Sequence, residues 1–275
     1  MAMAMWNYYL RILAAYLLIP NCYAQIIEIT DAQDILPYTQ DLNEQDLVSF
    51  DVKNVLFYPK DAIFHPNHAQ KRKEYLDNLR KQVTEEEFIK LNDIMVYSHD
   101  PELVDQNIPL VIKDIQKRNI KVIALTSGRL GSYQGSKNKE QTRIDRLKKL
   151  SIDFSSSFSN IKTIELYDEQ HKLFSVFNEG VLFANRSEKG HVIKKFLNSV
   201  HFKPQTIVHI DNSRTKLQSM QKFCNKYDIN FIGLHFIKIY QTTPAFNKKI
   251  NDFKFKMLQE NHTWISDEYA ELLIK

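Results

Sequence analysis

Three short, mainly apolar runs along the chain each end on a polar side chain. Residues 47–50 precede Asp51, residues 121–125 precede Thr126, and residues 206–210 precede Asp211. Runs of this kind are typical of parallel strands that are buried on both faces. The carboxyl ends of such strands form the edge of a doubly wound sheet where ligands bind. The pattern therefore predicts a buried sheet that delivers an acid, Asp51, to its ligand-binding edge.

Stretches with helical spacing separate these runs. Residues 69–82 are charged with apolar side chains at helical spacing, and Thr84 before three glutamates is typical of a capped helix start. Further strands are expected over residues 25–30 and 230–236, and further helices over residues 104–118, 189–200 and 214–226 and in two C-terminal segments. This alternation predicts an α/β fold, a doubly wound, Rossmann-like parallel sheet with helices on both faces.

Residues 130–188 have a different texture. A loop rich in Gly and Lys leads into a basic helix at residues 140–150 and then into β-like runs at residues 162–167, 172–177 and 181–184. Gly180 ends the turn between the last two runs, where a hairpin needs positive φ. We expect a small flap or insertion here and a helical insert over about residues 60–119, within one domain of residues 25–275.

Residues 1–24 have the pattern of an export signal. Arg11 precedes an apolar run at residues 12–19, and Pro20 and the small residue Ala24 follow. The run is too short to span a bilayer by itself. We expect a signal peptide and a periplasmic or secreted protein; an uncleaved N-terminal anchor is the alternative. No later segment is apolar enough to suggest an integral membrane domain.

Charge and cysteine content narrow the possible partners. The formal net charge is +4, which is too weak a bias to indicate nucleic-acid binding without a basic patch and a reading motif. Cysteine occurs only at Cys22 and Cys224, so no disulfide framework is expected. We expect Cys224 to be a small buried side chain on a helix.

Four residues recur in a known order. Asp51, Thr126, Lys189 and Asp211 follow one another on the elements that carry the four motifs of the haloacid dehalogenase (HAD) superfamily of phosphohydrolases, which the chain resembles over about residues 26–240. Arg129, the hairpin at residues 177–183 and the segment at residues 264–268 resemble an uncharacterised branch of secreted bacterial HAD-like proteins.

The resemblance implies a phosphomonoester hydrolase that works through an aspartyl-phosphate. Asp51 would be the nucleophile. Thr126, with Ser127 beside it, would bind the phosphoryl oxygens, and Lys189 would hold nucleophile and phosphate together. A Mg²⁺ ion would be held by oxygen atoms of the first and fourth motifs. This metal set comprises Asp51, the backbone carbonyl of Lys53, Asp211 and the neighbouring Asn212.

The chain departs from the family pattern at two positions. The superfamily's phosphatases carry a second Asp at the position of Lys53, where it acts as general acid and base, a role that typically contributes about 100- to 10,000-fold in rate. Asn212 stands where a second acid is common. Two hypotheses follow. Either Lys53, with its pKa lowered by burial and nearby positive charge, protonates the leaving group of a weak hydrolase, or an inactive pocket binds a phosphorylated or anionic ligand or serves a protein partner.

Other polar residues have plainer interpretations. Pro66 between His65 and His68 predicts a turn in a solvated loop rather than a zinc site. His209 on its buried strand is expected to be a core histidine, and Arg129 either faces the phosphate or caps a loop. A basic loop and helix are expected to form a solvated face. Its cationic residues are Lys137, Lys139, Arg143, Arg146, Lys148 and Lys149.

Overall fold

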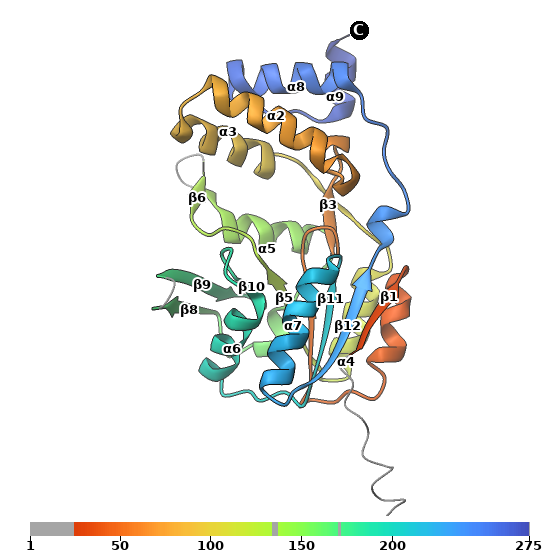
Figure 1. The fold of residues 1–275 in the computed structure, drawn as a ribbon. Coiled ribbons are helices and arrows are strands. Elements are labelled where there is room, and N and C mark those ends of the chain that lie inside the picture. Colours follow the sequence, from red (N-terminus) through yellow and green to blue (C-terminus); the bar gives the residue numbers. More distant parts are fainter. Residues whose placement is uncertain (1–24, 134–136, 170–171, 275) are drawn as a thin grey trace, which may run out of the picture.

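A single sheet of eight strands runs through the middle of the molecule, with helices on both faces (Figure 1). The computed structural model describes residues 25–133, 137–169 and 172–274. The expected signal peptide, residues 1–24, lies outside the described residues. The strand order is β1-β12-β11-β2-β5-β10-β9-β8. The strand β2, which leads to Asp51, is therefore paired on both sides.

The first six strands in this order are parallel, and β9 and β8 complete the sheet as an antiparallel pair. The prediction of an α/β fold with a mostly parallel central sheet is confirmed. The strands are β1 (Gln25–Ile29), β2 (Leu47–Phe50), β5 (Lys121–Thr126), β8 (Thr163–Asp168), β9 (Leu173–Asn178), β10 (Val181–Phe183), β11 (Thr206–Asp211) and β12 (Asn230–Phe236).

The register of the central strands brings their polar ends together. Phe50 of β2 pairs with Ile210 of β11 and with Ala124 of β5. The backbone N–H of Asp51 donates to the Ile210 carbonyl at 2.8 Å, which extends the ladder past the end of β2. Asp51 and Asp211 thus leave neighbouring strands at the same edge.

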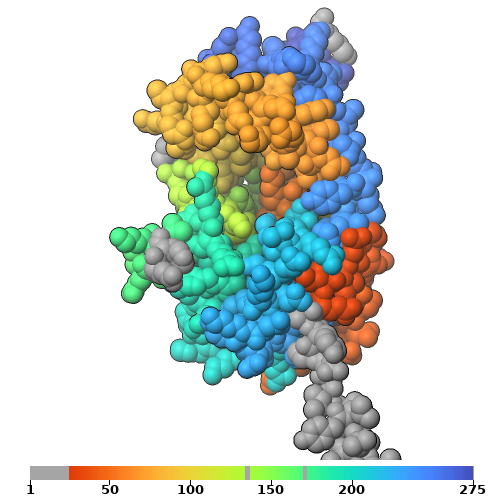
Figure 2. Space-filling view, in the orientation of Figure 1, coloured from red at the N-terminus to blue at the C-terminus, as the bar shows by residue number. Residues whose placement is uncertain are grey.

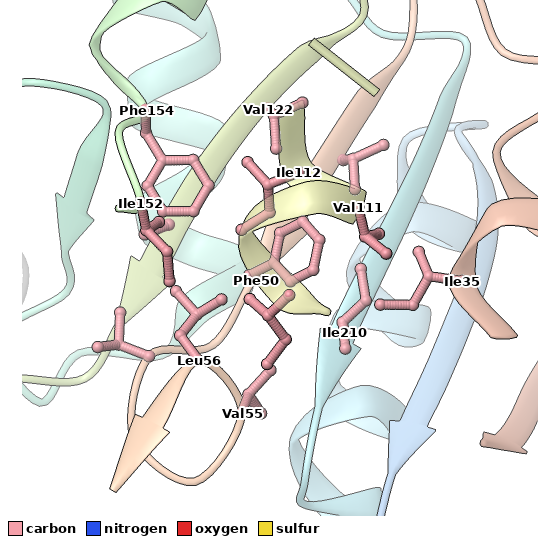
Figure 3. Packing of buried hydrophobic residues seen from close by; sticks show 14 of the residues in the cluster. Ile35, Phe50, Val55, Leu56, Val111, Ile112, Val122, Ile152, Phe154 and Ile210 are labelled. Carbon is pink, nitrogen blue, oxygen red and sulfur yellow. The ribbon is translucent and has the colours of Figure 1, made fainter. Parts of the chain in front are cut away.

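Apolar side chains of the sheet meet two layers of helices. On one face, Phe50 packs among Val111, Ile112 and Phe154 (Figure 3). On the other face, Leu47 belongs to a cluster with α6 and α7. Helices on both faces were predicted and are confirmed. Those of the first face are η1 (Ala32–Tyr38), α4 (Ile108–Lys117) and α5 (Lys139–Lys149); those of the second are α6 (Lys189–Ser199) and α7 (Arg214–Lys226).

Four helices form a cap above the carboxyl edge of the sheet (Figure 1). Helices α2, α3 and α8 share a third apolar cluster with Phe64 and Trp264 of the neighbouring segments, and it includes Leu91 and Leu258. The expected insert over residues 60–119 is wrong in extent, because α4 packs on the sheet and the C-terminal helices complete the cap. The cap helices are α2 (Ala69–Gln82), α3 (Glu85–Tyr97), α8 (Lys248–Asn261) and α9 (Asp267–Leu273).

The β-like runs after residue 160 are part of the sheet, not a flap. Val181 of β10 pairs in parallel with Ala124 of β5, and β10 is buried on both faces. Gly180 has φ +80°, and a Cβ there would lie 2.2 Å from the Phe154 carbonyl oxygen. The turn therefore needs glycine, as expected. The strands on either side of it, β9 and β10, belong to the central sheet, where β10 pairs with β5.

Short elements connect the sheet to the cap. The chain leaves Asp51 through a tight turn, in which Asn54 has φ +66°, and enters the cap along β3. It returns along β4, which pairs with β3. The short elements are β3 (Phe57–Pro59), β4 (Pro101–Leu103), β6 (Ser132–Tyr133), β7 (Lys137–Asn138), η2 (Ala62–Phe64), η3 (Pro66–His68), η4 (Ser155–Phe158) and η5 (Lys238–Tyr240).

Candidate functional site

Asp51 is buried at the end of β2 and lies between two ammonium groups. Its Oδ1 accepts a hydrogen bond from Lys189 Nζ at 2.8 Å, and its Oδ2 lies 3.4 Å from Lys216 Nζ. Only 3% of Asp51 is exposed, so a charged carboxylate there requires opposite charges close by. The two lysines supply them and hold the carboxylate in one orientation.

Lys189 connects the two acids of the edge. It opens helix α6, and its Nζ donates to Asp51 Oδ1 at 2.8 Å and to Asp211 Oδ2 at 2.7 Å. A cation at a helix N-terminus is disfavoured by the helix dipole. The two carboxylates offset that cost, and the helix start in turn fixes where the ammonium lies.

Asp211 is held ionised at the end of β11. Burial raises the pKa of its carboxyl, but Lys189, His209 and Lys216 together bring that pKa well below its usual range. Its Oδ1 also accepts from the Ser213 backbone N–H at 2.9 Å, at the start of α7. Asp211 is therefore an acceptor at neutral pH rather than a proton donor.

His209 is a buried histidine next to Asp211, as expected. Its Nδ1 lies 2.9 Å from Ser49 Oγ and 3.1 Å from the Ser49 carbonyl oxygen. Its Nε2 lies 3.4 Å from Asp211 Oδ2 and has no hydrogen-bond partner in the described part of the chain. Burial lowers the pKa of the ring, so His209 is neutral and supports β2 and β11 rather than adding charge.

Lys216 was not singled out from the sequence. It lies in the first turn of α7, and its Nζ is 3.4 Å from Asp51 Oδ2 and 3.9 Å from Asp211 Oδ1. Burial lowers its pKa, but the two acids outweigh this effect and raise the pKa above its ordinary value. A usable signal existed, because the first turn of a helix that follows a parallel strand lies at the ligand-binding edge.

The carboxylate oxygens that would be open to a Mg²⁺ ion both face Lys216. Asp51 Oδ2 and Asp211 Oδ1 are the carboxylate oxygens that Lys189 leaves free. A Mg²⁺ ion needs oxygen ligands at about 2.0–2.1 Å, and the ammonium lies against both of these. Among the described residues, no group of three or more His, Cys, Asp or Glu side chains could hold a metal ion. The arrangement does not fit a divalent ion, and no step below uses one.

Lys53 stands beside Asp51 without pairing with it. Within the described chain, no ion pair joins its ammonium to the Asp51 carboxylate. The Lys53 side chain is exposed to solvent, although enough of the protein surrounds it for burial to be the largest influence on its pKa. Burial lowers the pKa of Lys53 to about 8, with Arg72, Arg143 and Lys216 adding to the decrease and Asp51 opposing it. Lys53 can therefore exchange a proton near neutral pH.

Thr126 and Ser127 follow β5 at the same edge. Thr126 is buried, and its Oγ1 accepts from the Gly128 backbone N–H at 3.2 Å, which leaves its own hydroxyl proton available to donate. The Ser127 carbonyl accepts from the Arg186 N–H at 3.3 Å. A Cβ at Gly128 would lie 2.1 Å from Arg143 Nη1, so this glycine admits the guanidinium.

The side chain of Asn212, which was expected to be near a metal ion, contacts Tyr240 instead. Its Nδ2 donates to Tyr240 Oη at 2.9 Å, and its carbonyl lies 3.3 Å from His235 Nε2. These contacts tie the end of β11 to η5 through Tyr240 and to β12 through His235. The assignment of Asn212 to a metal set stays a prediction, and the structure gives this residue a structural role between the sheet and the segment that leads to α8.

The prediction that His65 and His68 lie in a solvated loop is wrong. His65 Nε2 lies 2.8 Å from the Ile239 carbonyl, and His68 Nε2 lies 2.8 Å from the Pro244 carbonyl. Both rings are buried because they join the segment before α2 to the segment before α8. Cys224, as expected, is buried on α7, and burial raises the pKa of its thiol to about 12.

The basic helix is also not a simple solvated face. Lys139 makes a buried ion pair with Asp93 of the cap at 2.7 Å. Arg146 donates to the His99 carbonyl at 2.9 Å, and Arg143 Nη1 is buried without a hydrogen-bond partner in the described residues. The expectation holds only for residues such as Lys149, which remains exposed. Helix α5 therefore connects cap to sheet and brings an unneutralised guanidinium near Lys53.

Comparison with known proteins identifies a different family from the one expected. Residues 28–271 match the profile of DUF2608, described as a protein of unknown function. This finding overturns the assignment to the HAD superfamily and to a HAD-like branch. The chain belongs to the DUF2608 family.

Relatives of the chain occur in Rickettsia and Chlamydia. An uncharacterised protein of Rickettsia prowazekii is 30% identical over 188 residues, and the match spans 63% of each chain. A Chlamydia pneumoniae protein named "Putative outer membrane protein" is 24% identical over 91% of this chain and 90% of its own. A Chlamydia trachomatis protein with the same name is 22% identical over 82% and 80%. Among the helices of the described chain, none has the length and apolar character needed to cross a membrane.

Proposed function

We propose that this member of the DUF2608 family hydrolyses phosphate monoesters, with Asp51 as nucleophile and Lys53 as the group that moves the proton. One observation carries the proposal. The buried Asp51 carboxylate is oriented by Lys189, and beside it lies Lys53 with a pKa of about 8. A positioned nucleophile and a group that titrates near neutral pH are the two requirements of a covalent hydrolysis.

In the first step, an oxygen of Asp51 attacks phosphorus. The bond between phosphorus and the ester oxygen breaks, and its electron pair leaves with that oxygen. The Lys53 ammonium gives its proton to the leaving oxygen, so an alcohol departs and Lys53 becomes a neutral amine. The lowered pKa of Lys53 makes this transfer easier than it would be for an ordinary lysine.

In the second step, water attacks the phosphorus of the aspartyl-phosphate. The Lys53 amine takes a proton from this water, and the bond between phosphorus and Asp51 breaks. Inorganic phosphate leaves, the carboxylate is restored and Lys53 is again an ammonium. The same residue thus acts as acid and then as base, which requires a pKa near the working pH.

The neighbouring cations would stabilise the charge of the transferred phosphoryl group. Lys189 and Lys216 already lie on opposite oxygens of Asp51, and the Thr126 hydroxyl has a proton to donate. Phosphoryl transfer depends mainly on positioning and on neutralising this charge. The lysines therefore supply the positive charge from the chain itself.

A second candidate is binding without turnover. Lys189 and Lys216 stabilise the negative charge of the Asp51 carboxylate, and this stabilisation lowers the reactivity of Asp51 as a nucleophile. In that case the edge would hold a phosphorylated or otherwise anionic ligand. Formation of an aspartyl-phosphate separates the two functions.

We also infer that the protein works in the cell envelope. The names of the two Chlamydia relatives support this location, and the export predicted from residues 1–24 agrees with it. Its substrate would then be a phosphate ester met outside the cytoplasm.

The test is turnover of p-nitrophenyl phosphate and of propyl phosphate by the purified chain, with chelator and with added Mg²⁺. We expect turnover that Asp51→Asn abolishes, and an intact-mass increase of one phosphoryl group in the parent that is absent from Asp51→Asn. No Asp51-dependent turnover in the parent, together with turnover in Lys53→Asp, would show that the parent is not an enzyme of this kind.

A further inference from the structure

A second group of cations lies beside the site, in a recess under the cap. The recess has a volume of about 620 Å³ and lies between α2, α3 and the loops that follow β5 and β10. Figure 2 shows the surface hollowed between the orange cap helices and the green segments below them. Its lining includes the guanidinium groups of Arg72, Arg129 and Arg186.

These three arginines carry charge that no side chain in the recess neutralises. Arg129 and Arg186 are exposed, and in the described parts of the chain neither guanidinium takes part in an ion pair or hydrogen bond. Arg72 donates to backbone carbonyls, to Phe64 at 2.9 Å and to Ile63 at 3.2 Å, which fixes its position without cancelling its charge.

The acids of the recess already have partners. Asp77 pairs with Lys73 at 2.7 Å, and Glu85 pairs with Arg80 at 3.2 Å. The recess therefore has an excess of three positive charges. Arginine is suited to bind phosphate and carboxylate through two parallel hydrogen bonds.

The backbone that carries Arg186 is held in a strained form. Arg186 has φ +70° and Asn185 has φ +47°, a left-handed region that is unfavourable for a residue such as arginine and more easily adopted by asparagine. Two hydrogen bonds hold it, from Arg186 N–H to the Ser127 carbonyl at 3.3 Å and from Leu130 N–H to Asn185 Oδ1 at 3.2 Å. They join the loop after β10 to the loop after β5, and strain of this kind clusters at ligand sites.

The recess opens at the same edge as Asp51. Arg129 follows Thr126 by three residues on the loop after β5, the strand that pairs with β2. Arg72 lies close enough for its charge to lower the pKa of Lys53. A ligand that occupies both groups of cations would have to extend from the recess past Lys53 to Asp51.

We propose that Arg72, Arg129 and Arg186 form a second anion subsite, so that the ligand is a phosphate monoester carrying a second phosphoryl group. This inference rests on the proposed function for the first phosphoryl group, which would lie at Asp51 and Lys189. The second phosphoryl group remains bound in the recess and positions the first for attack.

The test compares ligands with one and two phosphates. Calorimetric titration of the full chain, and of Asp51→Asn to exclude turnover, would use propyl phosphate, 1,3-propanediol bisphosphate and 1,6-hexanediol bisphosphate. We expect at least one bisphosphate to bind about 10- to 100-fold more tightly than propyl phosphate, since charge-assisted hydrogen bonds to a second group are added.

The double variant Arg129→Gln, Arg186→Gln should bring bisphosphate binding down to the level of propyl phosphate and leave propyl phosphate within about twofold of the parent. The control is Lys203→Gln, Lys222→Gln, which also removes two positive charges from exposed positions away from the recess and should change neither ligand.

Equal affinity of the parent for propyl phosphate and the bisphosphates would overturn the second subsite. The same conclusion would follow if the double variant weakened both kinds of ligand alike, or if the parent bound none of the three ligands. The proposed hydrolysis is judged separately, by turnover and by the aspartyl-phosphate. A chain that prefers bisphosphates but does not turn over propyl phosphate would keep the subsite and lose the enzyme.

Discussion

Two buried lysines in this protein each bridge two aspartates, one at the sheet edge and one in the cap. Lys189 lies 2.8 Å from Asp51 and 2.7 Å from Asp211, and Lys254 lies 2.8 Å from Asp61 and 2.5 Å from Asp267. The two clusters have the same composition and almost the same distances. What differs is how the remaining carboxylate oxygens are used.

In the cap, every carboxylate oxygen has a hydrogen-bond donor. Asp61 accepts from Trp264 Nε1 at 2.8 Å and from the Asp267 N–H at 3.0 Å, and Asp267 accepts from the Ala62 N–H at 2.8 Å. Lys254 also lies 4.4 Å from the centre of the Trp264 ring. Each buried polar group is satisfied, so this cluster fastens the C-terminal helices to the cap.

At the sheet edge, Asp211 Oδ1 accepts from the Ser213 N–H at 2.9 Å, but the second oxygen of Asp51 is only loosely paired. Asp51 Oδ2 has Lys216 at 3.4 Å, and the Lys216 side chain is 41% exposed. Lys53 stands nearby in a solvent-reaching position. The comparison indicates that the cap cluster is saturated with hydrogen-bond donors, whereas at the sheet edge one oxygen of Asp51 has only a long contact with Lys216.

The largest expected effect is on stability. Lys254→Met leaves the buried Asp61 and the partly buried Asp267 without a cation, and removing one partner of such a cluster costs about 3–5 kcal/mol. Lys189→Met should cost less, because Lys216 remains as a second cation beside both of its acids. Urea unfolding followed by tryptophan fluorescence measures both. Lys256→Met, an exposed lysine on the same helix α8, is the control; equal losses for Lys254→Met and Lys189→Met would end the distinction.

The second effect is on turnover. Lys53→Met should reduce hydrolysis of propyl phosphate by about 100- to 10,000-fold, because an alkoxide needs a proton to leave. Hydrolysis of p-nitrophenyl phosphate should fall much less, since its leaving group departs as a stable anion. Steady-state rates on both substrates check this, and an equal loss on both would assign Lys53 to charge stabilisation rather than proton transfer.

The proton role of Lys53 also predicts opposite pH responses in the two steps. Below a pH of about 8 the residue is an ammonium and can donate, so formation of the aspartyl-phosphate should slow as pH rises through 8. Breakdown needs the amine, so it should slow as pH falls below 8. Rapid-quench measurement of the phosphorylated chain separates the steps, and Lys53→Met should remove both dependences.

The smallest effect concerns metal binding. Lys216→Asn removes a positive charge from beside Asp51 and Asp211, the two acids that would hold a Mg²⁺ ion, and we expect Mg²⁺ affinity to rise by about 10-fold on electrostatic grounds. Calorimetry with MgCl₂ measures it. Lys222→Asn, an exposed lysine further along α7, should leave Mg²⁺ binding unchanged. If the two variants behave alike, Lys216 does not compete with a metal.

Local patterns were sufficient for the elements that approach the ligand edge. Apolar runs that end on Asp51 and Asp211 predicted β2 and β11, and helix spacing predicted α2 and α7 at the residues where they occur. These features are encoded within a few residues, since burial on both faces requires continuous apolar side chains. The lowered pKa of Lys53 followed from the same reasoning, because burial and nearby cations both disfavour its charge.

The sequence by itself determined an α/β protein with an acid and a lysine at one edge of its sheet. Only the tertiary structure decided that Lys216 faces that acid, that β8 and β9 extend the sheet, and that the C-terminal helices complete the cap. Each of these depends on partners far apart along the chain, such as Asp51 with Lys216 and Asp61 with Trp264. No local pattern encodes such pairs, because their free energy comes from groups that meet only after the chain has folded.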